Sequence, residues 1–151
     1  MTSPPSNHCN VAVAHYGHRD IKVKHWAIVV MLDSVNALEY QISGSTMTYE
    51  LMPIGSVTLL DNASYLGKVC QWFWTHALAC LFCQVVIGTI DKNRLPDFGT
   101  NIAKGRIVHG DLNWNCQNWV VERLHDLKIE NYAVRELDQT WLLDQLANSQ
   151  R

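Results

Sequence analysis

Apolar and polar positions follow two different periods along this chain, and these periods predict its secondary structure. Residues 25–32 (His-Trp-Ala-Ile-Val-Val-Met-Leu) are apolar on both faces after the first position, as expected of a central strand that is buried on both sides. Residues 37–43 alternate between apolar and polar side chains, which is typical of a strand with one buried face. Runs at 10–16, 46–52 and 85–90 predict three further strands.

A helical period replaces this alternation towards the C-terminus. With Asn113 or Asn115 as N-cap, a helix is predicted to run to about Lys128. Its apolar positions fall on one stripe, formed by Cys116, Trp119, Val120, Leu124 and Leu127. Its solvated face is expected to carry three charged residues, Glu122, Arg123 and Asp126.

The fold class follows from the order of the elements. A weaker helical pattern covers 100–108, after a loop-rich stretch at 91–99, and a last helix is predicted over 137–147. Strands followed by a packed helix predict an α+β fold. We expect a small antiparallel sheet packed against the helix that bears the cysteine at its N-terminus.

Composition places the chain among globular proteins. It has 151 residues, of which 48% are hydrophobic and 17% charged, and we predict a flexible tail at 1–9 followed by a single domain over 10–151. The net charge of −2 and the lack of a basic block argue against nucleic acid as a partner. The N-terminus lacks signal-peptide features, and five cysteines are an odd count. We therefore expect a cytoplasmic protein with reduced thiols and no stable membrane span, of undefined oligomeric state.

Cys116, His25 and Gln41 are the candidate catalytic residues. A thiol in the first turn of a helix has its pKa lowered by the positive end of the helix dipole, which favours the nucleophilic thiolate. His25 would take the thiol proton and return it to a leaving group, while Gln41 would orient the imidazole. The backbone N–H of Cys116 would help to stabilise an oxyanion, and Trp114 would shape an apolar substrate slot. No cofactor or metal is predicted for this site.

Residues 69–84 differ in character from the rest of the chain. They include three of the five cysteines and no charged side chain apart from His76. Three interpretations stay open: a zinc site from His76, Cys80 and Cys83, a short membrane run interrupted by polar residues, and a core helix. A fourth hypothesis is an insertion from a retained intron, because the codons can spell splice signals in order. Its removal would join 66–68 to 85–90 in one strand.

Three pieces of the sequence carry a resemblance to a known superfamily: residues 25–30 (His-Trp-Ala-Ile-Val-Val), 40–42 (Tyr-Gln-Ile) and 115–120 (Asn-Cys-Gln-Asn-Trp-Val). In this order they resemble the circularly permuted papain-like proteins, which include lecithin retinol acyltransferase and NlpC-type relatives. The chain is more similar still to a group of uncharacterised fungal proteins with His-Trp-Ala, Tyr-His-Val and Trp-Asn-Cys-x-x-Trp-Val pieces. The resemblance implies a permuted papain-like fold, with Gln41 where histidine is commoner.

The resemblance also implies a nucleophile at Cys116 and a base at His25. The residues and the resemblance together predict a cysteine-dependent hydrolase or acyltransferase that acts through a thioester on an amide, ester or isopeptide. The substrate, a small molecule or a peptide, is not specified by the sequence. The alternative is a catalytically inactive papain-like binding domain, because a cysteine on an apolar helix stripe is commonly a small core residue.

Overall fold

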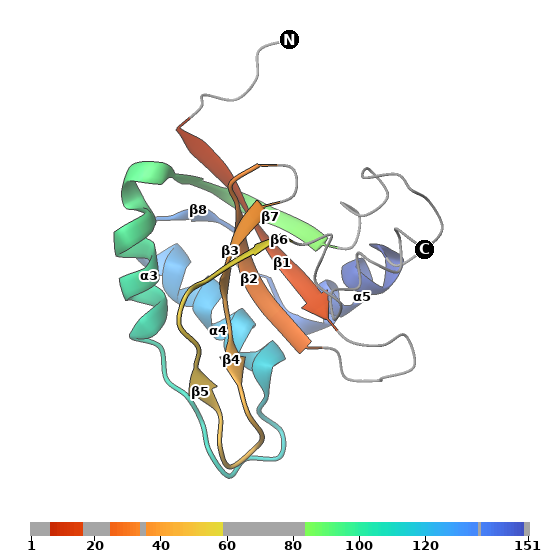
Figure 1. The fold of residues 1–151 in the computed structure, drawn as a ribbon. Coiled ribbons are helices and arrows are strands. Elements are labelled where there is room, and N and C mark those ends of the chain that lie inside the picture. The colour runs from red at the N-terminus through yellow and green to blue at the C-terminus, as the bar shows by residue number, and fades with distance from the viewer. Residues whose placement is uncertain (1–6, 17–24, 34–35, 59–83, 136, 150–151) are drawn as a thin grey trace.

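The computed structural model describes residues 7–16, 25–33, 36–58, 84–135 and 137–149 (Figure 1). Its elements follow in the order β1 (His8–Tyr16), β2 (His25–Met31), β3 (Asn36–Tyr40), β4 (Ile42–Ser43), β5 (Glu50–Leu51), β6 (Gly55–Thr58), β7 (Gln84–Asp91), η1 (Lys92–Arg94), α3 (Leu95–Ala103), α4 (Cys116–Ile129), β8 (Ala133–Val134) and α5 (Gln139–Ser149). The predicted segment 69–84 falls almost entirely outside the described residues, as do the three residues of the zinc interpretation.

Six strands form one antiparallel sheet in the order β6-β3-β2-β1-β7-β8. β2 lies inside this sheet between β1 and β3, as its two apolar faces predict. The register places His25 opposite Tyr16 and Ile28 opposite Tyr40. His25 therefore begins β2 at the end of the sheet that faces the small β4–β5 hairpin (Figure 1).

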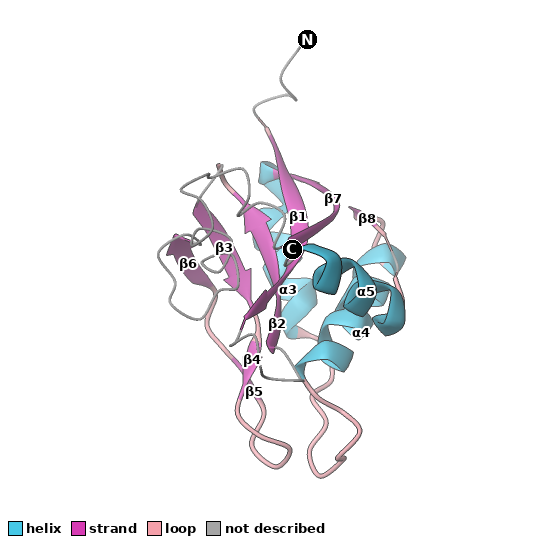
Figure 2. Cartoon of the chain, turned by 90° about the vertical axis from the view of Figure 1, so that its right-hand side faces the viewer, coloured by secondary structure: helices cyan, strands magenta, loops and turns pink. Residues whose placement is uncertain are grey.

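The helices α4 and α5 lie on the same side of the sheet, as Figure 2 shows. α4 packs on β2, α5 packs on β7, and α3 packs beside α4. The predicted stripe of α4 is buried in full, and it meets β2 through Trp26, Ile28 and Val30. Burying this apolar surface is the main favourable contribution to docking the helix. The α+β class and the antiparallel sheet packed on the cysteine helix are thereby confirmed.

Several predicted boundaries differ from the observed ones. β1 begins at His8, and Cys9 is buried in the core, so the last two residues of the predicted tail belong to the sheet. Of the strand predicted over 46–52, only Glu50–Leu51 is extended, because Ser45 and Thr48 form a turn after Gly44. A φ of +119° at Gly44 suits that turn, since glycine has no Cβ to clash.

The region predicted as a loop at 91–99 contains a helix. α3 runs over Leu95–Ala103, and Pro96 occupies its first turn, where a missing N–H costs nothing. The weak helix predicted over 100–108 is therefore wrong in position. Among the described residues, no helix has the length and apolar character required to cross a bilayer.

Candidate functional site

Cys116 is the first residue of α4, and its neighbours build the start of that helix. The side-chain oxygen of Asn115 accepts a hydrogen bond from the N–H of Gln117 at 2.8 Å. The side-chain oxygen of Asn118 accepts one from the N–H of Asn115 at 3.0 Å. This capping box fixes the first turn, so the positive end of the helix dipole lies at the Cys116 sulfur.

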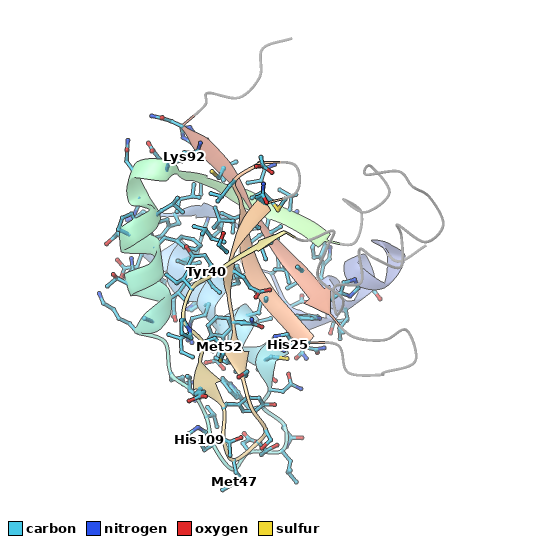
Figure 3. All side chains as sticks on the ribbon, viewed as in Figure 1. His25, Tyr40, Met47, Met52, Lys92 and His109 are labelled. Carbon is cyan, nitrogen blue, oxygen red and sulfur yellow. The ribbon has the colours of Figure 1, made fainter. Side chains whose placement is uncertain are left out.

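His25 stands between Gln41 and Cys116. Its Nε2 lies 2.6 Å from Oε1 of Gln41, and it makes a second hydrogen bond with the Cys116 side chain. Because Nε2 is engaged by Gln41, we assign the contact with Cys116 to the other ring nitrogen, Nδ1. Figure 3 shows His25 at the start of β2. It lies at the lower end of the sheet, from which the β4–β5 hairpin extends.

The pKa values of the two reactive groups move towards each other. Burial raises the pKa of the Cys116 thiol, but the hydrogen bond and charge of His25 and backbone hydrogen bonds from Trp26 and Gln117 outweigh it, so the pKa falls below its ordinary 9.0. Burial lowers the pKa of His25, but Cys116, Gln41 and the charge of a nearby carboxylate outweigh it, so the pKa rises above 6.5. Both shifts favour a thiolate–imidazolium ion pair.

A fourth side chain extends this row beyond the three predicted residues. The side-chain amide nitrogen of Gln41 donates a hydrogen bond to Oε1 of Glu39 at 2.7 Å. Glu39 is only 6% exposed, although it lies on the polar side of the strand pattern. We call Cys116, His25, Gln41 and Glu39 the thiol row. Sequence reasoning gave Glu39 no role, and the available signal was its position two residues before Gln41, on the same face of a strand.

Aromatic side chains form a wall beside the sulfur. The ring of Tyr49 meets the ring of Trp114 edge to face, with centroids 5.8 Å apart. Burial and the charge of Cys116 raise the pKa of Tyr49, so this tyrosine lies within electrostatic range of the thiol. Trp114 is 5% exposed, and its indole N–H donates to Glu122 at 2.7 Å.

Two loops support this wall, and they are joined to each other. The N–H of Gly110 donates to the carbonyl of Thr46 at 2.9 Å, and Nε2 of His109 donates to the carbonyl of Tyr49 at 2.7 Å. These bonds tie the loop before α4 to the β4–β5 hairpin. Figure 3 shows His109 and Met47 together towards the tip of this pair of loops.

The structure brings all three predicted site residues into one hydrogen-bonded row. Cys116 is buried, with 7% of its surface exposed, and His25 is half-buried. Within the described parts of the chain, no group of three or more histidine, cysteine, aspartate or glutamate side chains is arranged to hold a metal ion.

Comparison of the chain with protein-family models, with curated proteins and with solved structures found no match. The resemblance to permuted papain-like proteins therefore stays a prediction, and the case for a function depends on the geometry of the thiol row.

Proposed function

We propose that the chain is a cysteine-dependent hydrolase or acyltransferase of papain-like type, with Cys116 as nucleophile, His25 as base and Gln41 as the residue that orients the base. One observation carries this proposal: His25 makes hydrogen bonds with both the Cys116 and the Gln41 side chains. A histidine that only filled space would not need both contacts. The order of a histidine on a strand, an amide between two strands and a cysteine at the start of a helix supports the papain-like assignment.

The chemistry follows from this arrangement. Nδ1 of His25 takes the thiol proton, and the Cys116 thiolate attacks the carbonyl carbon of an amide or ester. A C–S bond forms while the carbonyl electron pair moves to oxygen, and the backbone N–H of Cys116 helps to stabilise that oxyanion. The intermediate collapses, the leaving group takes the proton from His25, and a thioester remains on Cys116. Water or a second nucleophile then releases the acyl group.

One observation favours the alternative, a binding domain without catalytic activity. Cys116 is 7% exposed and packs in the same core cluster as Trp119 and Val120. A cysteine kept for packing alone would have these neighbours. It would not, however, have a thiol pKa set by an adjacent histidine, so thiol reactivity separates the two functions.

The test is the pH dependence of Cys116 alkylation by iodoacetamide, followed peptide by peptide by mass spectrometry. In the wild type we expect labelling to persist well below pH 9.0, because His25 stabilises the thiolate. In His25→Ala the labelling curve should move towards the ordinary thiol range. Loss of the base should also lower acyl transfer from p-nitrophenyl acetate by about 10²-fold or more.

Two controls sharpen this test. Cys9 is a buried free cysteine in the same protein, and it reports labelling that follows local opening rather than thiolate formation. His125→Ala removes an exposed histidine on α4 and should leave Cys116 unchanged. A wild-type Cys116 that labels no faster than Cys9 and forms no acetyl thioester would overturn the enzymatic proposal and favour the binding domain.

A further inference from the structure

We propose that Glu39 is a positioning residue, which fixes the amide of Gln41 and thereby places the proton of the neutral His25 ring on Nε2. The contacts of the row carry this inference: Glu39 Oε1 accepts from Gln41 Nε2 at 2.7 Å, and Gln41 Oε1 lies 2.6 Å from His25 Nε2. For its catalytic consequence the inference rests on the proposed thiol chemistry. Its structural content, the tautomer of His25, can be measured without any substrate.

The first step concerns the orientation of the amide. The two ends of a glutamine amide have nearly the same shape, and only their hydrogen-bond partners distinguish them. A carboxylate offers acceptors and no donor, so the NH₂ group of Gln41 must face Glu39. The carbonyl oxygen of Gln41 must then face His25.

The second step concerns the histidine. An amide oxygen can only accept, so Nε2 of His25 must carry a proton to bond it at 2.6 Å. In the neutral ring the other nitrogen, Nδ1, then has a lone pair. That lone pair faces the Cys116 thiol, which is the direction needed to accept its proton. With the amide reversed, Nδ1 would carry the proton and could not act as the base.

Burial and local rigidity explain why Glu39 can hold this arrangement. Glu39 is 6% exposed, so its carboxylate depends on hydrogen-bond partners more than a surface carboxylate does. Between Glu39 and Gln41, the ring of Tyr40 packs edge to face on Phe98 with centroids 5.2 Å apart. This contact holds the backbone that carries both side chains. The charge of Glu39 also favours the imidazolium form of His25.

The direct test is the tautomer of His25, read from ¹H–¹⁵N correlation spectra of histidine-labelled protein. Cys116→Ala is used as the background so that no ion pair obscures the result, and the spectra are recorded at alkaline pH so that the ring is neutral. We expect the Nε2–H tautomer in this background, and a mixture of the two tautomers when Glu39→Gln is added, because a glutamine can present either a donor or an acceptor. His109, which donates to Tyr49 through its own Nε2, is the internal control and should not change.

A second measurement uses the intact thiol. Glu39→Gln should slow Cys116 alkylation near pH 7 by about tenfold, the size expected from one charge-assisted hydrogen bond. The effect should shrink when Gln41→Ala is already present, because Glu39 then has no amide to orient and only its charge still acts on His25. A purely structural role for Glu39 would instead give the same loss in both backgrounds.

The outcomes separate this proposal from the proposed function. If the wild type shows low-pH reactivity but Glu39→Gln changes neither the His25 tautomer nor the alkylation rate, the role of Glu39 is wrong and the thiol chemistry stands. If Cys116 of the wild type has ordinary reactivity but the tautomer depends on Glu39, the positioning role holds and the enzymatic function fails.

Discussion

Two groups of polar side chains meet at α4, and they differ in whether a proton can move between a thiol and a base. The thiol row at the first turn joins a thiol to an imidazole, and either group can hold the proton. Further along the helix, Arg123 bonds Asp126, with Nε at 3.0 Å from Oδ2 and Nη2 at 2.9 Å. We call Arg123, Asp126, Glu122 and Arg106 the arginine cluster.

The arginine cluster corrects the prediction that Arg123 faces solvent. Arg123 is 2% exposed, and its Nη1 donates to the carbonyl of Arg106 at 3.1 Å. Gly105 lies so close that a Cβ atom built there would be 1.9 Å from Arg123 Cζ. The guanidinium therefore holds the backbone at 105–106 against the helix, and this loop leads to Trp114.

The comparison teaches that burial of polar groups does not by itself indicate chemistry. A guanidinium cannot act as a base, so Arg123 contributes to structure and not to proton transfer. In the thiol row the pKa values of Cys116 and His25 are shifted in opposite directions, towards exchange of a proton. Variants of α4 should therefore separate effects on stability from effects on the thiol.

The largest expected effect on stability comes from Arg123→Ala. Removal of the guanidinium leaves a gap beside Gly105 and takes the main partner from Asp126, and we expect a loss of about 3 kcal/mol in the free energy of unfolding. This is the low end for a broken buried pair, because the Asp126 side chain is 42% exposed. Chemical denaturation measures the loss. A large change in the pH profile of Cys116 alkylation in the folded variant would contradict the claim that Arg123 affects stability and not the thiol.

A smaller effect is expected at the helix starts. Asn115→Ala and Asp138→Ala each remove an N-cap, at α4 and at α5, and each should cost about 1 kcal/mol of stability. Only Asn115→Ala should also raise the pKa of Cys116, because it loosens the turn whose dipole favours the thiolate. Chemical denaturation of the two variants measures the loss of stability, and the pH dependence of alkylation measures the change in the pKa of Cys116. Equal alkylation profiles would mean that the α4 cap does not tune the thiol.

The smallest expected effect is the contribution of Glu122 to stability, which should depend on pH in the acid range. Burial raises the pKa of Glu122, but hydrogen bonds from Arg106 and Trp114 outweigh it, so the pKa lies below its ordinary 4.5. The stabilisation is therefore complete above pH 4.5 and is lost as the pH falls through the folded value. We expect Glu122→Gln to cost about 0.5 kcal/mol near neutral pH, since the Arg106 side chain is 68% exposed. Thermal unfolding from pH 7 to pH 3 should show the two proteins converging, and a constant difference would contradict this assignment.

Much of this architecture could be predicted from local patterns, because those patterns report burial and helix starts. The stripe of α4 and the cap at Asn115 were predicted, and so was the central position of β2. The helix α3 was not, because Pro96 and Gly99 suggest a loop when their neighbours are unknown. In the structure Pro96 lies in the first turn, and Gly99 allows close approach to Ile54 and Tyr40.

Long-range partners set the limit of prediction at the site. The choice of Cys116, His25 and Gln41 needed only residue types and expected elements, and the structure brings these three together. Glu39 and Arg123 were missed because a charged side chain is normally exposed. The burial of Glu39 depends on its contact with Gln41, which is a near neighbour in sequence. The burial of Arg123 depends on residues 105–106, which lie far away in sequence. The presence of Glu39 and Gln41 on the polar face of one predicted strand did indicate in part that these two side chains would lie together.

The separation of His25 and Cys116 along the chain has a consequence for how reactivity first arises. The imidazole belongs to β2 and the sulfur to α4, with β7 and α3 between them in sequence. Until the sheet has formed and α4 has docked on it, the sulfur has neither the imidazole nor the helix end beside it and behaves as an ordinary thiol. If Cys116 has the proposed reactivity, a newly made or unfolded polypeptide should lack an activated thiol at this position, and low-pH labelling of Cys116 should measure the fraction of molecules that have reached the native state.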